Sequence, residues 1–295
     1  MSSPFDKVTA ISPQQSAADG DMETEFAASG ISSEFMSATA QVGPGSGKWP
    51  DETVALESKI RKQKRNMREF IKWYWSAPYF NPDGTVLMYI DPDGNEHPYI
   101  VRKPYLKPGS PQEFKERKYL KPSKWDIQDE ILATVPYLHP ARLEIKAAIL
   151  DFHEGEKKCA CAVFFGQVAL GIGGCDSWRD PTRKGKIHPW ILDEIRRMQK
   201  ANPGVRLLIR LWPDGDFKDA TKDVGRGYAG LVAQLRLLDV DVVLMDLTEA
   251  YGLSAKFDDL VGLHGYAEVM SKAVQCDPSI LPENLEDLIR RYSLL

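Results

Sequence analysis

The chain has 295 residues, of which 43% are hydrophobic and 27% are charged, and its formal net charge at pH 7 is -4. This length predicts one or two globular domains. The slightly acidic balance excludes an overall basic field for a polyanionic partner, although it is compatible with a local basic surface. The sequence has no long apolar run and starts with a polar segment, so it predicts no membrane span, no secretory signal and a cytoplasmic location.

The first 48 residues are rich in Ser, Ala, Gly, Gln and Thr and show almost no apolar periodicity. They end in the run Gly43-Pro44-Gly45-Ser46-Gly47. Such a segment buries too little apolar surface to offset the entropy that ordering costs. We therefore expect residues 1–48 to form a disordered arm.

A helix is predicted from Asp51 to about Ser76, where apolar residues recur at roughly helical spacing. A basic cluster surrounds them: Lys59, Arg61, Lys62, Lys64, Arg65, Arg68 and Lys72. The cluster has two interpretations, a solvated helix face or a surface that follows the phosphates of nucleic acid. The aromatic residues between Trp73 and Phe80 suit either base stacking or a buried core.

A β-hairpin is predicted next. Apolar-rich runs at 85–90 and 97–103 flank the segment Asp91-Pro92-Asp93-Gly94-Asn95, which supplies the positive φ angles of a hairpin turn. Pro-rich, basic sequence follows to Lys124, and residues 125–138 are a candidate helix. Residues 49–144 are therefore interpreted as a small α+β module, with a basic helix and a hairpin, that leads into the next domain.

From Ile145 onward, short apolar runs alternate with amphipathic segments. Strands are predicted at 147–152, 168–172, 206–212 and 240–247. Helices are predicted at 156–164, 189–200, 225–238, 258–274 and 282–292. Nearly continuous apolar strands separated by helices predict a parallel sheet covered on both faces. Right-handed crossovers then give a doubly wound, Rossmann-like α/β domain over residues 145–295.

Acidic residues follow three of the predicted strands: Asp151 and Glu154, Asp214 and Asp216, and Asp246 and Glu249. In parallel sheets the chemistry lies beyond the carboxyl ends of the strands, so these acids are expected at one edge. A single acid after a strand is usually a helix cap. The joint arrangement instead predicts a magnesium site, because Asp214 and Asp216 are one residue apart and a third carboxylate would complete a clamp for a phosphoryl group.

The run His153-Glu154-Gly155-Glu156-Lys157-Lys158-Cys159-Ala160, directly after an apolar strand, resembles the start of primase-type Toprim domains. Leu170-Gly171-Ile172-Gly173-Gly174, then Trp178-Arg179, then Asp214-Gly215-Asp216 continue the same order of parts. The likeness is closest to the Toprim-like domain of unknown function in phage and plasmid primase-like proteins. The closing segment of that domain resembles Lys256-Phe257-Asp258-Asp259-Leu260-Val261, and the likeness covers about residues 74–266.

The resemblance implies roles for individual residues. Glu154 would act as a general acid or base or help to hold the metal, and Asp214 and Asp216 would hold Mg²⁺. The residues implied in substrate binding are Lys157, Lys158, Arg179, Lys256, Asp258 and Asp259. For the two adjacent lysines, phosphate binding at a helix start and a solvated helix start are both open. For the last three residues, a salt-bridged helix start is the alternative.

A self-sufficient primase-helicase would add a zinc module and a P-loop. Here Cys159 and Cys161 are separated by a single residue, and no Gly-x-x-x-x-Gly-Lys-Ser/Thr segment occurs. We therefore expect a Mg²⁺-dependent Toprim protein of DNA replication, of phage or plasmid type, with primase-like nucleotidyl transfer on single-stranded DNA. Its partners would be nucleotides, the DNA template and a separate replicative helicase. The alternatives are a Toprim-type nuclease and a catalytically inactive DNA-binding accessory module of a replication complex.

Overall fold

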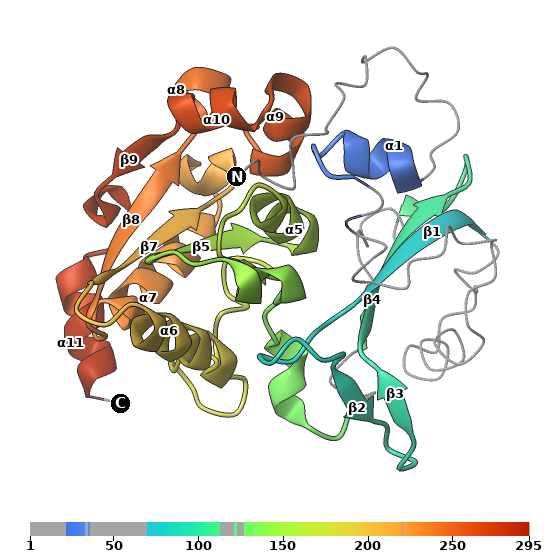
Figure 1. The fold of residues 1–295 in the computed structure, drawn as a ribbon, viewed down its shortest axis with the longest axis horizontal. Coiled ribbons are helices and arrows are strands. Elements are labelled where there is room, and N and C mark those ends of the chain that lie inside the picture. Colours follow the sequence, from blue (N-terminus) through green and yellow to red (C-terminus); the bar gives the residue numbers. More distant parts are fainter. Residues whose placement is uncertain are drawn as a thin grey trace.

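The computed structural model describes residues 22–32, 35, 70–112, 121–122, 127–219 and 221–294. Within them, a larger α/β unit built on a five-stranded sheet lies beside a smaller unit of two-stranded sheets (Figure 1). Among these residues, no helix has the length and the apolar character that crossing a bilayer requires.

The central sheet has the strand order β6-β5-β7-β8-β9. Its strands are β5 (Ile149–Glu154), β6 (Ala169–Ile172), β7 (Leu207–Trp212), β8 (Val240–Asp246) and β9 (Val274–Cys276). The first four run parallel, whereas β9 pairs antiparallel with β8. The prediction of an α/β domain on a parallel sheet is therefore confirmed for β5 to β8, whereas the antiparallel β9 was not predicted.

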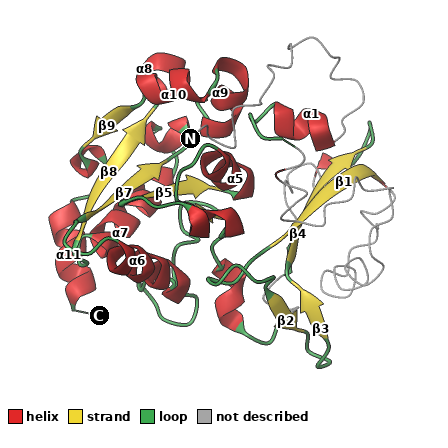
Figure 2. Ribbon diagram, in the orientation of Figure 1, coloured by secondary structure: helices red, strands yellow, loops and turns green. Residues whose placement is uncertain are grey.

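Helices cover both faces of this sheet (Figure 2). One face is covered by α6 (Pro189–Ala201), α7 (Val224–Leu235) and α11 (Leu285–Ser293). The other face carries α5 (Glu156–Phe164), the short α8 (Thr248–Tyr251), α9 (Phe257–His264) and α10 (Tyr266–Lys272). The single helix predicted over 258–274 is divided into α9 and α10, because Gly265 between them has a φ of 84°.

The smaller unit contains two antiparallel strand pairs. β2 (Met88–Ile90) and β3 (Glu96–Pro98) form a hairpin at the predicted turn, but residues 100–103 of the predicted second run belong to the next strand. β1 (Ile71–Pro78) pairs with β4 (Ile100–Leu106). The helix predicted from Asp51 to Ser76 is therefore wrong over residues 71–76, and its residues 51–69 lie outside the described ones. Bulky aromatic residues favour a strand once a partner such as β4 is present.

The candidate helix at 125–138 is also wrong over the described residues from 127 onward. A 3-10 turn covers Glu130–Thr134, and Pro136 follows it. Proline has no backbone N–H to continue a helix, and the chain becomes extended. Tyr137 then exchanges two backbone hydrogen bonds with Gly171 in β6. A second 3-10 turn, Pro140–Glu144, leads toward β5.

The prediction of a disordered arm is wrong for residues 22–32, which pack against the rest of the protein. Helix α1 (Met22–Ala27) places Phe26 in the core with 0% of its surface exposed, and Ile31 is 2% exposed. Gly262 of α9 permits this contact, because a Cβ at that position would collide with the carbonyl group of Ala28. Most other residues of the predicted arm lie outside the described part of the chain.

Candidate functional site

Glu154 and the segment Asp214-Gly215-Asp216 lie at the carboxyl ends of two neighbouring parallel strands. In the register of β5 and β7, His153 lies opposite Trp212. One residue further along, Glu154 ends β5, and the chain leaving β7 passes through Pro213 to Asp214. The structure thus brings the three acids to one edge of the sheet.

The glycine between the two aspartates is required by close packing. Gly215 begins a 3-10 turn (Gly215–Lys218), and its N–H donates to the carbonyl of Ala255 over 2.8 Å. A Cβ on Gly215 would lie 2.8 Å from the carbonyl oxygen of Leu253, which leaves no room for a side chain. The loop before α9 therefore fixes the backbone that carries both aspartates.

The carboxyl group of Glu154 is half-buried and accepts a hydrogen bond from the hydroxyl of Tyr228, with 2.9 Å between the two oxygens. Burial raises the pKa of Glu154, and the negative charges of Asp214 and Asp216 add to that rise. Lys158 and the Tyr228 hydrogen bond act in the opposite direction, but the net pKa stays above its usual value. A raised pKa suits a carboxyl group that exchanges protons near neutral pH.

Two lysines neutralise the aspartates. Nζ of Lys158 lies 2.5 Å from Oδ1 of Asp214, and Nζ of Lys222 lies 2.8 Å from Oδ2 of Asp216. Burial alone would lower the pKa of Lys158, but nearby carboxylates, with Asp214 the strongest, raise it above its usual value. Lys158 is therefore a charged partner of the site acids, and in this arrangement it contacts a carboxylate rather than open solvent.

The three acids fit Mg²⁺ in the type of ligand that they offer. They present only carboxylate oxygens, and a divalent cation would relieve the repulsion that contributes to the raised pKa of Glu154. Within the described residues, however, no three His, Cys, Asp or Glu side chains form a group that could hold a metal ion. Binding would require Asp214 to share or release its contact with Lys158.

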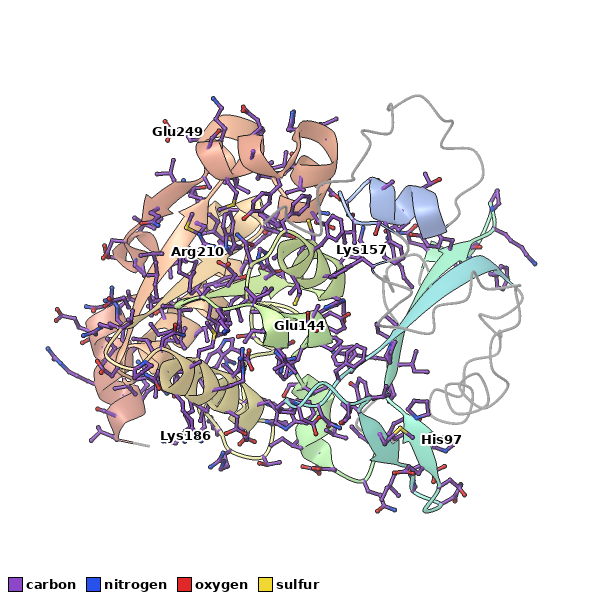
Figure 3. The ribbon with its side chains drawn as sticks, in the orientation of Figure 1. His97, Glu144, Lys157, Lys186, Arg210 and Glu249 are labelled. Carbon is purple, nitrogen blue, oxygen red and sulfur yellow. The ribbon has the colours of Figure 1, made fainter. Side chains whose placement is uncertain are left out.

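Lys157 and Asp258 belong to a second cluster, which we call the α1 clamp: Glu25, Ser29, Lys103, Lys157 and Asp258. Nζ of Lys157 lies 2.8 Å from Oε1 of Glu25, 2.9 Å from Oγ of Ser29 and 3.5 Å from Oδ2 of Asp258. Lys103 of β4 lies 2.5 Å from the same Glu25 oxygen. Figure 3 shows Lys157 on the side of α5 that faces α1. The α1 clamp therefore joins α1, β4, α5 and α9.

The geometry of α5 explains why two adjacent lysines reach different clusters. Successive residues of an α-helix point about 100° apart. Lys158 therefore turns toward Asp214, while Lys157 turns toward Glu25. Because the two lysines are adjacent in a predicted helix, the sequence already indicated that their side chains point in different directions.

Among the described residues, Arg179, Lys256 and Asp259 are not direct partners of the strand-end acids. The guanidinium of Arg179 forms an ion pair with Asp176 at 2.8 Å and lies 5.0 Å from the ring centre of Trp178. Lys256 and Asp259 are exposed at the start of α9. In the part of the chain that the structure describes, none of the three forms a hydrogen bond or ion pair with those acids.

Two further acids of the strand ends have structural partners. Asp151 is fully buried, and its two carboxylate oxygens each lie 2.7 Å from a nitrogen of Arg210. Asp246 forms an ion pair with Lys218. Glu249 is exposed on α8, near the outer edge of the molecule (Figure 3). The candidate site therefore contains fewer acids than the six that follow predicted strands in the sequence.

Two buried groups near the site were not predicted from the sequence. Tyr228 resembles the other apolar positions of α7, so nothing in the pattern marks its hydroxyl. Glu156, in the first turn of α5, is 5% exposed and accepts a hydrogen bond from the hydroxyl of Tyr79. Tyr79 and Phe80 are core residues, whereas the side chains at 71–76 lie outside the described ones.

The chain was compared with protein-family models, with curated proteins and with solved structures. No family model matches it, and neither the curated proteins nor the solved structures give a match. The interpretation of the site therefore depends on the sequence motifs and on the geometry described above.

Proposed function

We propose that this chain is a Mg²⁺-dependent Toprim-type protein of DNA replication, which transfers nucleotides in primer synthesis on a single-stranded DNA template. The observation that supports this most is that Glu154 and the segment Asp214-Gly215-Asp216 follow two adjacent parallel strands, and that burial, with the negative charges of the two aspartates, raises the pKa of the glutamate. Two acids fixed by the backbone and a third with a raised pKa suit phosphoryl chemistry.

In the proposed reaction each acid has a separate task. Glu154 would accept a proton from the attacking hydroxyl group or return one to the leaving oxygen. Asp214 and Asp216 would hold Mg²⁺, which neutralises phosphate charge and orients the attacking oxygen. Lys158, once it releases Asp214, would contact a substrate phosphate. The partly exposed side chain of Arg179 and the exposed side chain of Lys256 are further candidates for contacts with the DNA backbone.

The α1 clamp changes the proposal for two of the substrate-binding candidates. Lys157 already contacts Glu25 and Ser29, and Asp258 contacts Ser29 and Lys157, so their proposed role is to join α1 to α5 and α9. Asp259 remains a candidate for substrate binding, because its side chain is exposed beside the clamp. A separate helicase would unwind the DNA, because the sequence contains no P-loop for that activity.

The test is an incubation of the purified chain with single-stranded DNA, nucleoside triphosphates and Mg²⁺. Short labelled oligonucleotides are expected with the wild type and with Glu249→Gln, which changes an exposed acid outside the site. They should disappear with Glu154→Gln, with Asp214→Asn and after chelation of Mg²⁺. Shortened template DNA instead of new oligonucleotides would replace the primase proposal with a nuclease.

A DNA-binding accessory module is the second candidate, and one observation favours it. Lys158 already contacts Asp214, and in the described residues no three-acid group is assembled for a metal ion. An accessory module predicts DNA binding that is equal in wild type and Asp214→Asn, with no product in either. Fluorescence anisotropy with labelled single-stranded DNA, run beside the synthesis assay, separates these two functions.

A further inference from the structure

Tyr228 is the residue that links α7 to the strand-end acids. It lies inside α7 with 0% of its surface exposed, and its hydroxyl donates to Oε1 of Glu154. Buried tyrosine hydroxyls usually have a hydrogen-bond partner, and here the partner is the half-buried carboxylate at the end of β5. The contact joins two segments that are far apart in the sequence.

The position of α7 is set by close packing against the loop that follows β6. A Cβ on Gly227 would lie 2.8 Å from both the Cβ and the carbonyl oxygen of Cys175, so only glycine allows this approach. The indole nitrogen of Trp178 donates to the carbonyl oxygen of Gly227 over 3.2 Å. One turn later, a Cβ on Gly230 would lie 3.0 Å from the Trp178 ring. The Tyr228 hydroxyl is therefore held by a rigid support.

The same helix is connected to the aspartates of the site. α7 begins at Val224, shortly after the turn that carries Asp216. Lys222, between them, forms the ion pair with Asp216. Any displacement of α7 would thus affect the orientation of Glu154 and the segment of Asp216 together.

We propose that Tyr228 is a positioning residue, which fixes the rotation of the Glu154 carboxylate and leaves its second oxygen for the reacting groups. This inference depends on the proposed function for its catalytic consequence, but not for the hydrogen bond itself. Without the Tyr228 hydroxyl, the carboxylate is free to rotate, and the ammonium group of Lys158 is a charged neighbour that attracts it. Catalysis depends steeply on such orientation.

A spectroscopic test uses the variant Tyr228→Phe, which removes only the hydroxyl group. The infrared spectra are recorded in alkaline solution, where Glu154 is ionised despite its raised pKa. The carboxylate stretch of Glu154 is assigned as the band that is present in the wild type and absent from Glu154→Gln. We expect this band to shift in Tyr228→Phe and to stay in place in Tyr292→Phe, a matched change on α11. An unshifted band in folded Tyr228→Phe would overturn the proposal. Should that variant not fold, 3-fluorotyrosine at position 228, a stronger donor, should shift the band in the opposite direction.

A kinetic test addresses the consequence for catalysis. In primer synthesis, Tyr228→Phe should lower kcat by roughly 10-fold and leave the KM for nucleotides unchanged, because the hydroxyl orients a reacting group and does not bind substrate. An unchanged kcat would overturn the positioning role. If the band shifts in Tyr228→Phe but the wild type makes no primers, the proposed function is contradicted and the hydrogen bond remains established.

Discussion

Lys157 and Lys158 are neighbours in α5, yet they belong to charge clusters of different character. In the α1 clamp, two acids face two lysines, and Asp258 is only 3% exposed. Burial would raise the pKa of Glu25, but Lys157, with hydrogen bonds from Lys103 and Tyr105, lowers it to about 2. At the strand ends, by contrast, the pKa of Glu154 is raised.

The difference between the clusters teaches how the same residue types serve two purposes. A balanced and buried set of charges holds elements together, because removing any member leaves an unpaired charge. An excess of acids in a half-buried position retains the capacity to take up a proton or a cation. The α1 clamp is therefore expected to govern stability, and the strand-end acids are expected to govern activity.

The largest effect should come from Lys157→Met. It leaves Glu25 and Asp258 without their shared cation in a buried place, and we expect a loss of about 4 kcal/mol in the free energy of unfolding. Lys158→Met is the matched control one residue away. It should cost less, about 2 kcal/mol, since the side chain of Asp214 is 21% exposed and can hydrate, whereas that of Asp258 is 4% exposed. Urea unfolding followed by circular dichroism measures both, and equal losses would contradict the comparison.

The next effect concerns activity. Glu154→Gln should lower the rate of primer synthesis by about 100-fold or more, because it removes the group that exchanges the proton. Asp258→Asn should keep the activity of the wild type per folded molecule, although it lowers stability. The measurement is the rate of primer synthesis of each variant, divided by the fraction of its molecules that are folded. A loss of activity in folded Asp258→Asn would show that the α1 clamp contributes to catalysis and not only to stability.

A smaller effect is expected from Gly262→Ala in α9. The new methyl group would collide with the carbonyl of Ala28 and displace residues 22–32, at a cost of about 2 kcal/mol. Hydrogen exchange should show faster exchange in residues 22–32, with α6 unchanged. Ser271→Ala, on the exposed side of α10, is the control and should leave the exchange of residues 22–32 as it is in the wild type.

The smallest effect is a pH dependence of stability. The pKa of Glu25 falls from 4.5 to about 2 in the folded protein, so its contribution is present above pH 4.5 and is lost as the pH falls toward 2. The pH-dependent part of the stability difference between wild type and Glu25→Gln should therefore be about 1 kcal/mol after allowance for solvent screening, present at neutral pH and lost as the pH falls below 4.5. Thermal unfolding between neutral and acidic pH measures it. A difference that stays constant would show that the Glu25 charge is not involved.

The local pattern of apolar residues was sufficient to predict the parallel strands of the α/β sheet. The apolar runs of β5 to β8 and the helix α5 were predicted within about two residues, since a strand buried on both faces must be apolar along its length. The order of elements then implied parallel strands, and parallel strands place Glu154 near Asp214. These conclusions need only local burial and the rules of chain connection.

Tertiary structure alone decided the partners of individual side chains. The strand at 71–76 depends on β4, and the place of α1 depends on Gly262 in a distant helix. The division between Lys157 and Lys158, and the contact of Tyr228 with Glu154, join segments that are remote along the chain. Periodicity reports which face of an element is buried, but not which distant group meets it, because that depends on how the whole chain packs.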